Sequence, residues 1–499
     1  MGTCESTISL RRMGKELDVL SAIERAICPD IYHPAVASDG LLTRLRIPGG
    51  VLNSAQCVAI AQLLGAIGLE YLQVTNRANL QLRALSRDLA PELLTKLAAC
   101  GLAASNTAIE GIRSMMMSPT AGIDARELVD VRPLAAAWHE YLDRHPELGI
   151  LSTKFSVGFD GGGSVGISDR PNDITLLAVS DSPMERLRQR EFSLYLSMGD
   201  RGDAPSPVGV RLTLAECVPM LAAIAQSYRV GILALGGDSR RKPRLRSVIH
   251  YYGLAEFSAI VRRELAGSRH FIFKNSDLEP DPISANADCH LGVHPQRQAG
   301  LYYLGVVLPL GRWTIAQIQG LGSIAARYGS GNIRLTPWQN LIIPDLQAVD
   351  LKTVQGLISA LGLVQTANHP SSLLRACAGT TGCQFSATDT QTDAIALADY
   401  LAAKYSLDRP LSIHFSGCDK SCAQHDRADI TLWGDNPNPE SPRYRLEIDG
   451  LTAAFTTESI DLLPPERVPI AIGNLIATYH QNRLNPQESF RSFTRRDRG

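Results

Sequence analysis

The chain has 499 residues, of which 44% are apolar and 20% charged, and its formal net charge is −1. The length suits about three domains of ~150 residues each, and the composition is ordinary for a globular protein. A charge so close to zero gives no bulk electrostatic reason to expect nucleic acid or a membrane surface as partner.

Two further exclusions follow from the apolar pattern and the N-terminus. No apolar run approaches the roughly 20 residues that a membrane span needs, and the first residues lack the layout of a secretory signal. The chain holds 10 cysteines. Without a signal sequence, these cysteines indicate a reducing cytoplasm, so we expect no membrane partner and no disulfide framework.

An internal repeat organises the chain after an expected helical extension, whose helix-like stretch covers residues 17–27. Residues 48–79 match residues 309–340 at a constant offset of 261. In the first copy, apolar residues over 41–47 alternate with Arg44 and Arg46, which predicts a strand with one solvated face. Asn53 or Ser54 can cap a helix that stops at Gly68. A second strand is expected over 71–74, so each copy is a β-α-β unit.

The repeat continues beyond these units. The tetrapeptide D-I-T-L occurs at 173–176 and at 429–432, and K-F-S at 154–156 echoes H-F-S at 414–416. We therefore predict an α+β fold with pseudo-twofold duplication and a ligand cleft between its halves. The predicted divisions are an extension (1–37), a first β-α-β half-repeat (38–105), a half whose loops lack cysteines (106–274), a connector (275–299), a second half-repeat (300–368), a half with cysteine-bearing loops (369–486) and a mobile tail (487–499).

Four cysteines in the second half form the most informative motif. Cys377 and Cys383 stand in C-x5-C, and Cys418 and Cys422 in C-x3-C. A four-iron cluster needs one thiolate per iron, and two pairs on two loops can supply them. Zinc, which favours tighter pairs, is the second interpretation, and disulfides are the third. The corresponding loops of the first half, S-M-M-M-S-P-T-A-G and D-G-G-G-S-V-G, contain no cysteine.

Arginines form the second chemical theme. Arg77, Arg113, Arg244 and Arg246 lie in segments that are repeat-related or close to the cysteine-type loops. Guanidinium groups bind carboxylates bidentately, so several of them suit a polycarboxylate ligand. A solvated basic surface is the alternative. Glycines at 161–166 fit a dinucleotide fingerprint, but no helix is expected after them, so a nicotinamide site is not predicted.

Several of these motifs together resemble the sirohaem-dependent nitrite and sulfite reductases. They are the two cysteine loops, T-N-R-A-N-L-Q-L-R, I-R-S-M-M-M-S-P-T-A-G-I-D, G-V-H-P-Q-R-Q-A-G-L and L-T-P-W-Q-N-L, and the resemblance runs from about residue 39 to about 434. Within that superfamily, H-F-S-G-C-D-K-S-C-A-Q and D-R-P-N-D-I-T-L look more like the precorrin-3B synthases of cobalamin biosynthesis.

The resemblance implies that 38–105 and 300–368 are ferredoxin-like half-repeats and that 369–486 is an iron–sulfur half, paired with a cluster-domain-like half over 106–274. It also implies a reaction and its cofactors. The reaction is a monooxygenase step, the oxygen-dependent hydroxylation of precorrin-3A with lactone formation. A 4Fe-4S cluster on Cys377, Cys383, Cys418 and Cys422 is implied, and a separate non-haem iron is compatible with the resemblance. His425 with Asp426, next to the second cysteine loop, is the candidate pair for such an iron. Electrons would come from an external donor, a ferredoxin or a reductase.

The alternative implied by the resemblance is a ferredoxin-dependent nitrite or sulfite reductase that holds sirohaem as a haem cofactor. Arg77, Arg113 and Arg244 then match positions around sirohaem, Arg246 stands where a lysine is frequent, and Cys422 matches the thiolate that bridges cluster and haem iron. Precorrin-3A and sirohaem are both octacarboxylates, so arginines suit either ligand. A tetrapyrrole carrier or an electron-transfer protein without catalysis is the third hypothesis.

Overall fold

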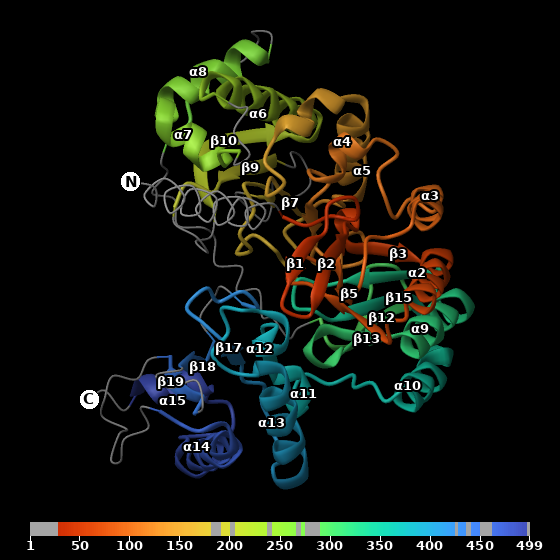
Figure 1. Ribbon diagram of the computed structural model, residues 1–499, viewed down its shortest axis with the longest axis vertical. Helices are drawn as coiled ribbons and strands as arrows, with labels where there is room; N and C mark the ends of the chain where they lie inside the picture. The colour runs from red at the N-terminus through yellow and green to blue at the C-terminus, as the bar shows by residue number, and fades with distance from the viewer. Residues whose placement is uncertain are drawn as a thin grey trace, which may run out of the picture.

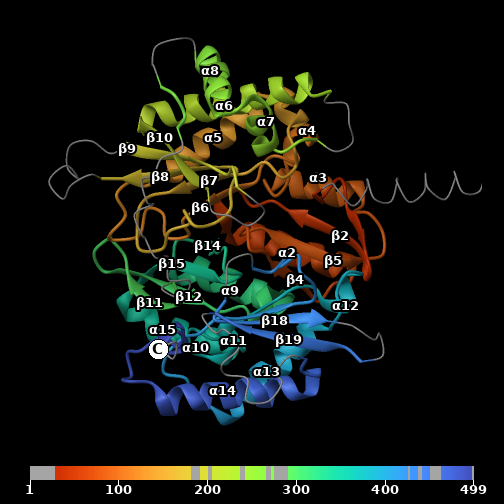
Figure 2. The ribbon, with the colours of Figure 1, turned by 90° about the vertical axis from the view of Figure 1, so that its left-hand side faces the viewer.

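The computed structural model describes residues 28–180, 191–199, 205–236, 242–265, 271–274, 290–424, 428–435, 441–449 and 462–496. Most of the expected N-terminal extension, including the helix-like stretch over 17–27, lies outside these ranges. The described elements form a stack with one mixed sheet at each end and two antiparallel sheets between them (Figures 1 and 2).

The two central sheets come from the two copies of the repeat. One has the strand order β1-β2-β5-β4-β13 and the other β11-β12-β15-β14-β3. The first copy contributes β1 (Ala35–Ala37), β2 (Gly40–Leu45), η1 (Pro48–Gly50), β3 (Val51–Asn53), α2 (Ser54–Ile67), β4 (Tyr71–Val74), β5 (Leu80–Leu85) and α3 (Pro91–Ala99). The second contributes β11 (Gly292–Pro295), β12 (Leu301–Val306), η4 (Pro309–Gly311), β13 (Arg312–Thr314), α9 (Ile315–Tyr328), β14 (Asn332–Leu335), β15 (Leu341–Gln347), η5 (Ala348–Asp350) and α10 (Leu351–Ala360).

Each copy gives one short strand to the other copy's sheet. Arg312 of β13 pairs with Gln73 of β4, and Val51 of β3 pairs with Arg334 of β14. Both exchanges obey the offset of 261, so the pseudo-twofold relation extends to residue register. Because of the exchange, the two copies share one hydrophobic core, in which Leu52 and Trp313 are fully buried.

The helices of the repeat begin and end as their sequences predict. Asn53 caps α2 by accepting from the backbone N–H of Gln56, whose side chain in turn accepts from the Asn53 N–H. This reciprocal pair satisfies two backbone donors that would otherwise have no partner. Gly68 ends the helix with a left-handed conformation at φ 73°, as glycine readily does. Thr314 and Gln317 form the equivalent box on α9.

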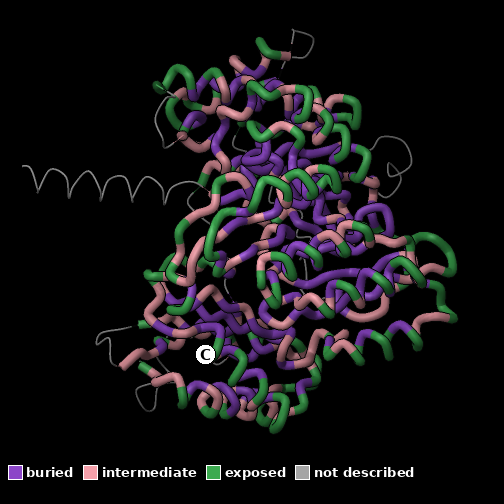
Figure 3. The backbone as a smooth tube through the Cα atoms, turned by 45° about the vertical axis from the view of Figure 1, so that its right-hand side comes forward, coloured by how far each residue is buried: buried purple, intermediate pink, exposed green. Residues whose placement is uncertain are grey.

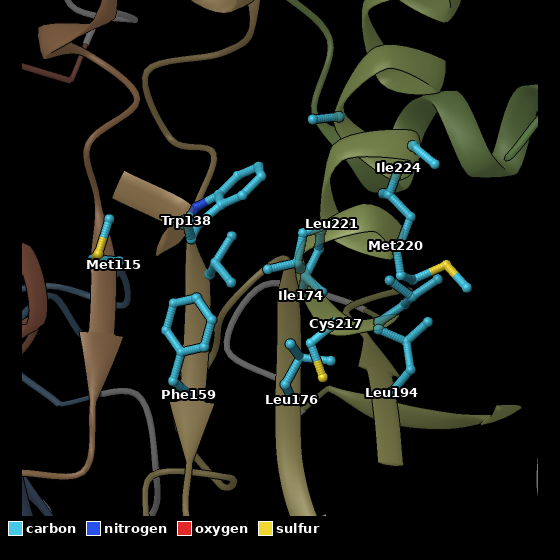
Figure 4. Packing of buried hydrophobic residues seen from close by; sticks show 14 of the residues in the cluster. Met115, Trp138, Phe159, Ile174, Leu176, Leu194, Cys217, Met220, Leu221 and Ile224 are labelled. Atoms are coloured by element: carbon cyan, nitrogen blue, oxygen red, sulfur yellow. The ribbon is translucent and has the colours of Figure 1, made fainter. Parts of the chain in front are cut away.

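The first end sheet belongs to the half whose loops lack cysteines and has the order β10-β9-β8-β7-β6. Its elements are α4 (Thr107–Glu110), β6 (Met115–Met117), α5 (Arg132–Arg144), η2 (Pro146–Ile150), β7 (Val157–Asp160), β8 (Ile174–Val179), β9 (Glu191–Leu196), β10 (Ser206–Thr213), α6 (Leu214–Ala234), α7 (Leu245–Tyr252) and α8 (Leu254–Glu264). Figure 4 shows Trp138 of α5 and Leu221 of α6 packed with strand residues such as Phe159 and Ile174.

Helix α6 corrects one sequence expectation. With 21 residues it is long and apolar enough to span a membrane by length and composition, although no such run was expected. Its inner face packs on the sheet and includes Met220, Leu221 and Ile224, each at most 2% exposed. A core helix that covers a sheet accounts for this composition.

The second end sheet has the order β16-β17-β18-β19. Its half contains α11 (Pro370–Leu373), β16 (Leu374–Ala376), α12 (Gly379–Gly382), α13 (Thr390–Lys404), β17 (Ile413–Ser416), β18 (Ile430–Asp435), β19 (Arg443–Ile448), η6 (Pro465–Arg467), α14 (Val468–Asn482) and α15 (Phe490–Arg496). Helices α13 and α14 pack together below the sheet in Figure 2. Buried stretches run through every layer of the stack, with exposed residues around them (Figure 3).

Strands β6 to β9 of the first end sheet repeat the topology of β16 to β19 in the second, and β10 extends the first sheet by one strand. Val157 of β7 pairs with Ile174 of β8, and Ile413 of β17 pairs with Ile430 of β18, all in parallel. This register gives an offset of 256, at which Ser156 corresponds to Ser412. The sequence echo between K-F-S at 154–156 and H-F-S at 414–416 was therefore placed four residues out of register.

Two predicted boundary segments also differ from the structure. Strand β11 lies inside the segment 275–299 that was expected to be a connector, and it pairs with β12 along its whole length. The tail from residue 487 was expected to be mobile, but Phe490 and Phe493 of α15 are 3% and 2% exposed in the core of the second half. These two apolar side chains explain why the basic tail is anchored.

Candidate functional site

The two cysteine loops leave adjacent strands of the second end sheet. Strands β16 and β17 are parallel, and Cys377 and Cys418 follow their carboxyl ends. The backbone N–H of Cys377 donates to the Phe415 carbonyl at 3.2 Å, and the N–H of Gly417 donates to the Cys377 Sγ at 3.2 Å. The two loops are thus joined directly at a sulfur atom. Hydrogen bonds to cysteine sulfurs are a feature of iron–sulfur sites, so this donor set fits such a cluster.

The cysteines of the described ranges are free thiols, and none of these eight residues forms a disulfide. Within those ranges, no three His, Cys, Asp or Glu side chains are grouped closely enough to hold a single metal ion. A four-iron cluster takes one thiolate per iron and does not need its ligands to meet at one ion. His425 and Asp426 lie outside the described ranges.

The first half has two loops at the corresponding positions, with hydroxyl and carboxylate side chains instead of thiols. Ser118 stands where Cys377 does, since its N–H donates to the Phe159 carbonyl at 3.1 Å as that of Cys377 does to Phe415. The Ser118 hydroxyl donates to the Val165 carbonyl at 2.7 Å. Asp124 accepts from the N–H and the hydroxyl of Ser164 at 2.5 and 3.2 Å. Hydrogen bonds therefore connect these two loops without thiolates.

The first ferredoxin-like unit contacts both cysteine loops. In the turn between β4 and β5, the Asn76 Nδ2 donates to the backbone carbonyls of Cys422 and Ala423 at 3.3 and 3.4 Å. On β5, the Arg83 guanidinium donates to the Gly382 carbonyl, beside Cys383, and pairs with Asp39 at 3.0 Å. The cysteine loops are therefore held between their own sheet and the central sheet.

Of the four predicted arginines, the structure brings Arg77 and Arg244 together. The Arg77 Nη1 donates to the Asn172 Oδ1 at 2.8 Å and to the Ser156 hydroxyl at 3.3 Å. The Arg244 Nη2 donates to the Asp173 Oδ1 at 2.8 Å, and Asp173 also accepts from Ser156. Burial lowers the pKa of Arg77 below its ordinary value, while the Asp173 carboxylate opposes this effect.

The other two predicted arginines have different surroundings. Arg113 is 2% exposed and its Nη1 donates to the Glu110 Oε2 at 2.8 Å. Glu110 is fully buried and also accepts from the Ala104 N–H at 2.7 Å. Burial raises the pKa of Glu110, and Arg113 opposes this rise. Arg246 is half-buried and its Nη1 donates to the Gly199 carbonyl at 2.9 Å.

The sequence reasoning missed three further cations at the site. Arg44 and Arg46, assigned to a solvated strand face, instead point inward: Arg46 is 3% exposed and Arg44 is half-buried. The Arg44 Nη1 lies 3.4 Å from the Cys28 Sγ. Lys154, which precedes β7, acts on the same thiol electrostatically together with Arg77. We call Arg44, Arg46, Arg77, Lys154 and Arg244 the basic cluster.

The basic cluster gathers four arginines and a lysine in one region. Within the described residues, Asp173 pairs with Arg244, and the Asp30 Oδ2 lies 4.0 Å from the Arg46 Nη1. Four arginines grouped in this way suit an anionic ligand. Alternate residues of an extended segment face the same side, so the spacing of Arg44 and Arg46 was the sequence signal for part of this site.

Comparisons with known proteins agree with this arrangement. The model of the nitrite/sulfite reductase ferredoxin-like half domain matches residues 35–100 and 294–361, and that of the nitrite and sulphite reductase 4Fe-4S domain matches residues 108–268. The latter range is the half without cysteines at the loop positions.

Individual relatives and one solved structure extend the similarity. The chain is 32% identical over 417 residues to a ferredoxin–nitrite reductase of Synechococcus elongatus, covering 81% of this chain and 78% of the relative. It is 29% identical over 443 residues to a precorrin-3B synthase of Sinorhizobium sp, covering 88% and 87%. The solved NirA protein of Mycobacterium tuberculosis superposes with a TM-score of 0.73 at 23% identity, covering 91% and 83%.

Proposed function

The chain belongs to the nitrite and sulfite reductase family, and we propose that within this family it is a monooxygenase like precorrin-3B synthase. The proposed reaction is the oxygen-dependent hydroxylation of the precorrin-3A ring with formation of a lactone from a side-chain acetate. An external donor, a ferredoxin or a reductase, would supply electrons. The proposed compartment is the reducing cytoplasm, where thiols stay reduced.

The basic cluster beside the second cysteine loop carries this proposal. Asn76 contacts the Cys422 carbonyl, and the next residue, Arg77, belongs to the basic cluster. An octacarboxylate macrocycle needs several cations around it, and guanidinium forks bind carboxylates bidentately. The basic cluster offers five cations within one region, and Asn76, the neighbour of Arg77 in sequence, contacts the loop that carries a proposed cluster ligand.

The kind of cation favours substrate binding over proton delivery. Four of the five cations in the basic cluster are arginines, and Lys154 is the single lysine among them. An arginine side chain stays protonated in proteins and therefore cannot donate protons to a substrate. A reductase that consumes many protons needs acidic groups, whereas a site that anchors carboxylates needs permanent charge. The similarity to the Sinorhizobium precorrin-3B synthase, which covers 87% of that protein, is consistent with this choice.

Cys377, Cys383, Cys418 and Cys422 are the residues that would hold the 4Fe-4S cluster. When bound, such a cluster passes single electrons between a donor and a site. The chain's own contribution is to keep the two loops together through the Gly417 N–H and to place Cys422 against Asn76.

A nitrite reductase with sirohaem as cofactor is the second candidate. It is supported by the identity of 32% to the Synechococcus elongatus enzyme and by the presence of Lys154, which can donate a proton. In this case the basic cluster would bind the carboxylates of sirohaem rather than those of a substrate.

The absorption spectrum of anaerobically purified protein separates the two candidates. The proposal predicts iron–sulfur absorption without sirohaem bands, and a hydroxylated lactone product by mass spectrometry when precorrin-3A, oxygen and a reductant are supplied. Strong sirohaem bands together with nitrite turnover would reverse the ranking. Binding of precorrin-3A without product under these conditions would support the third hypothesis, a carrier.

A further inference from the structure

Cys28 lies within the basic cluster and has no role in the function proposed above. Its Sγ is 3.4 Å from the Arg44 Nη1, and its backbone N–H donates to the Thr153 hydroxyl at 3.2 Å. The residue is half-buried and stands at the start of the described chain, far in sequence from the four proposed cluster ligands. Two contacts thus hold it at the place where the arginines gather.

The charges around this thiol favour its ionised form. Burial opposes ionisation, but Arg44, Arg46, Lys154 and Arg77 together outweigh burial and lower the pKa of Cys28 below its ordinary value. These groups come from β2 and the residue after it, from the segment before β7 and from the β4–β5 turn. By contrast, burial raises the pKa of Cys57 and of Cys217 to about 12, because no cation compensates for it.

Arg46 provides independent evidence that a ligand belongs beside this thiol. Its side chain is 4% exposed, and its Nη1 has no hydrogen-bond acceptor among the described residues; the carboxylate oxygen of Asp30 is 4.0 Å away. Its Nη2 donates to the Thr153 carbonyl at 3.4 Å, so Thr153 joins Arg46 to Cys28. A buried donor without an acceptor indicates a missing partner, which an anionic group of a ligand would supply.

We infer that Cys28 provides a thiolate to the ligand-binding site, where its sulfur lies against the bound acidic macrocycle and is shielded by it. The inference rests on the proposed binding of a tetrapyrrole. Arg44 acts as the positioning residue, since it contacts the sulfur directly. The thiolate gives the site a group that can take up a proton, which the four arginines of the basic cluster cannot do.

Alkylation of the anaerobically purified protein with iodoacetamide tests the inference. The thiolate attacks the methylene carbon, a carbon–sulfur bond forms and iodide leaves, so the rate follows the thiolate fraction. Peptide mass spectrometry measures the rate at Cys28 and at the exposed Cys100 in the same sample, from pH 6 to pH 10. The measurement is repeated with uroporphyrin, a stable octacarboxylate tetrapyrrole, whose binding is followed separately by fluorescence.

The expected result has three parts. The rate at Cys28 reaches its midpoint at a lower pH than the rate at Cys100 does. Bound uroporphyrin slows labelling of Cys28 about tenfold or more without slowing that of Cys100. In Arg44→Gln protein the midpoint of Cys28 moves up toward that of Cys100, which a purely structural role of Arg44 does not explain.

Two outcomes overturn the inference. One is an equal midpoint at Cys28 and Cys100, and the other is unchanged labelling of Cys28 when fluorescence shows uroporphyrin to be bound. Failure of uroporphyrin to bind contradicts the tetrapyrrole proposal and the shielding of Cys28 with it, while the pH midpoint still decides whether Cys28 is a thiolate. The two failures are therefore distinguishable.

Discussion

The side-chain amide of Asn76 donates to the backbone carbonyl of Cys422 at 3.3 Å, although 346 positions separate the two residues in sequence. The contact joins the turn that carries Arg77 to the loop that carries the last cysteine. It therefore unites the two chemical themes of the chain, thiolates and arginines, in one place.

Replacing Arg77 with alanine is expected to weaken binding of an acidic tetrapyrrole roughly 10- to 100-fold, the range for losing hydrogen bonds to a charged group. Iron and sulfide contents are expected to stay unchanged, because Arg77 contacts Asn172 and Ser156 rather than a cysteine loop. Fluorescence titration with uroporphyrin measures the loss. Arg246→Ala serves as control, because Arg246 contacts the Gly199 carbonyl and lies outside the basic cluster, and it should change binding by less than about threefold. Equal effects of both variants would mean that the basic cluster is not the binding site.

Replacing Cys383 with serine is expected to abolish the iron–sulfur cluster and all turnover, because a neutral hydroxyl does not replace a thiolate ligand to iron. Iron and sulfide per chain, together with the visible absorption band, measure the effect. Cys100→Ser is the matched control, since Cys100 is exposed at the end of α3 and belongs to neither cysteine loop. A Cys383→Ser protein with full iron content would exclude Cys383 as a ligand.

Arg113 is expected to act on stability rather than on binding. Arg113→Met leaves the fully buried Glu110 without its cation, which costs about 3–5 kcal/mol for a buried pair. Denaturant unfolding should show this loss. In the double variant Glu110→Gln with Arg113→Met, much of the stability is expected to return because no buried charge is left unpaired. If Arg113→Met protein had normal stability but bound the tetrapyrrole weakly, Arg113 would instead be a ligand-binding residue.

The stability of the first half is expected to depend on pH through Glu127. Burial raises the pKa of Glu127 to about 7 in the folded protein, against about 4.3 in an unfolded chain. The folded state therefore binds the Glu127 proton more tightly than the unfolded chain does. The stability that this proton contributes is fully present below about pH 4 and is lost as the pH rises through 7.

The variant Glu127→Gln isolates this effect. Between pH 5 and pH 8 the wild type should lose up to about 3 kcal/mol more stability than the variant does, by the free energy of the pKa shift. Unfolding by denaturant at both pH values measures the difference. Glu140→Gln, on the exposed face of α5, should follow the wild type. If the unfolding free energies of Glu127→Gln and of the wild type changed equally between pH 5 and pH 8, the Glu127 carboxyl would not be protonated as described.

The sequence allowed the repeated parts of the fold to be predicted because their signals are local. The caps of α2 and the strand over 71–74 appear where spacing placed them. The exchange of β3 and β13 could not be predicted, since three-residue strands carry almost no pattern and their partners lie far away in the chain. The alignment of K-F-S at 154–156 with H-F-S at 414–416 was wrong by four residues, because a similarity of three residues is weaker evidence than the register of paired strands.

The site was predictable in part for the same reason. The cysteine spacing is specific, and Arg77 and Arg244 lie together around Asp173 as their segments suggested. The ion pair of Arg113 with Glu110 could not be predicted, because an arginine in a buried ion pair and one that binds a ligand look alike in sequence. Cys28 and Lys154 belong to the site through tertiary contacts alone, and no motif marks either residue.

Iron and acid-labile sulfide analysis of protein purified without exposure to air shows directly whether the four cysteines hold a 4Fe-4S cluster. We predict about four iron and about four sulfide per chain. Both contents should fall when any one of Cys377, Cys383, Cys418 or Cys422 is replaced by serine. Protein that contains neither element, or that holds zinc in their place, would contradict this prediction.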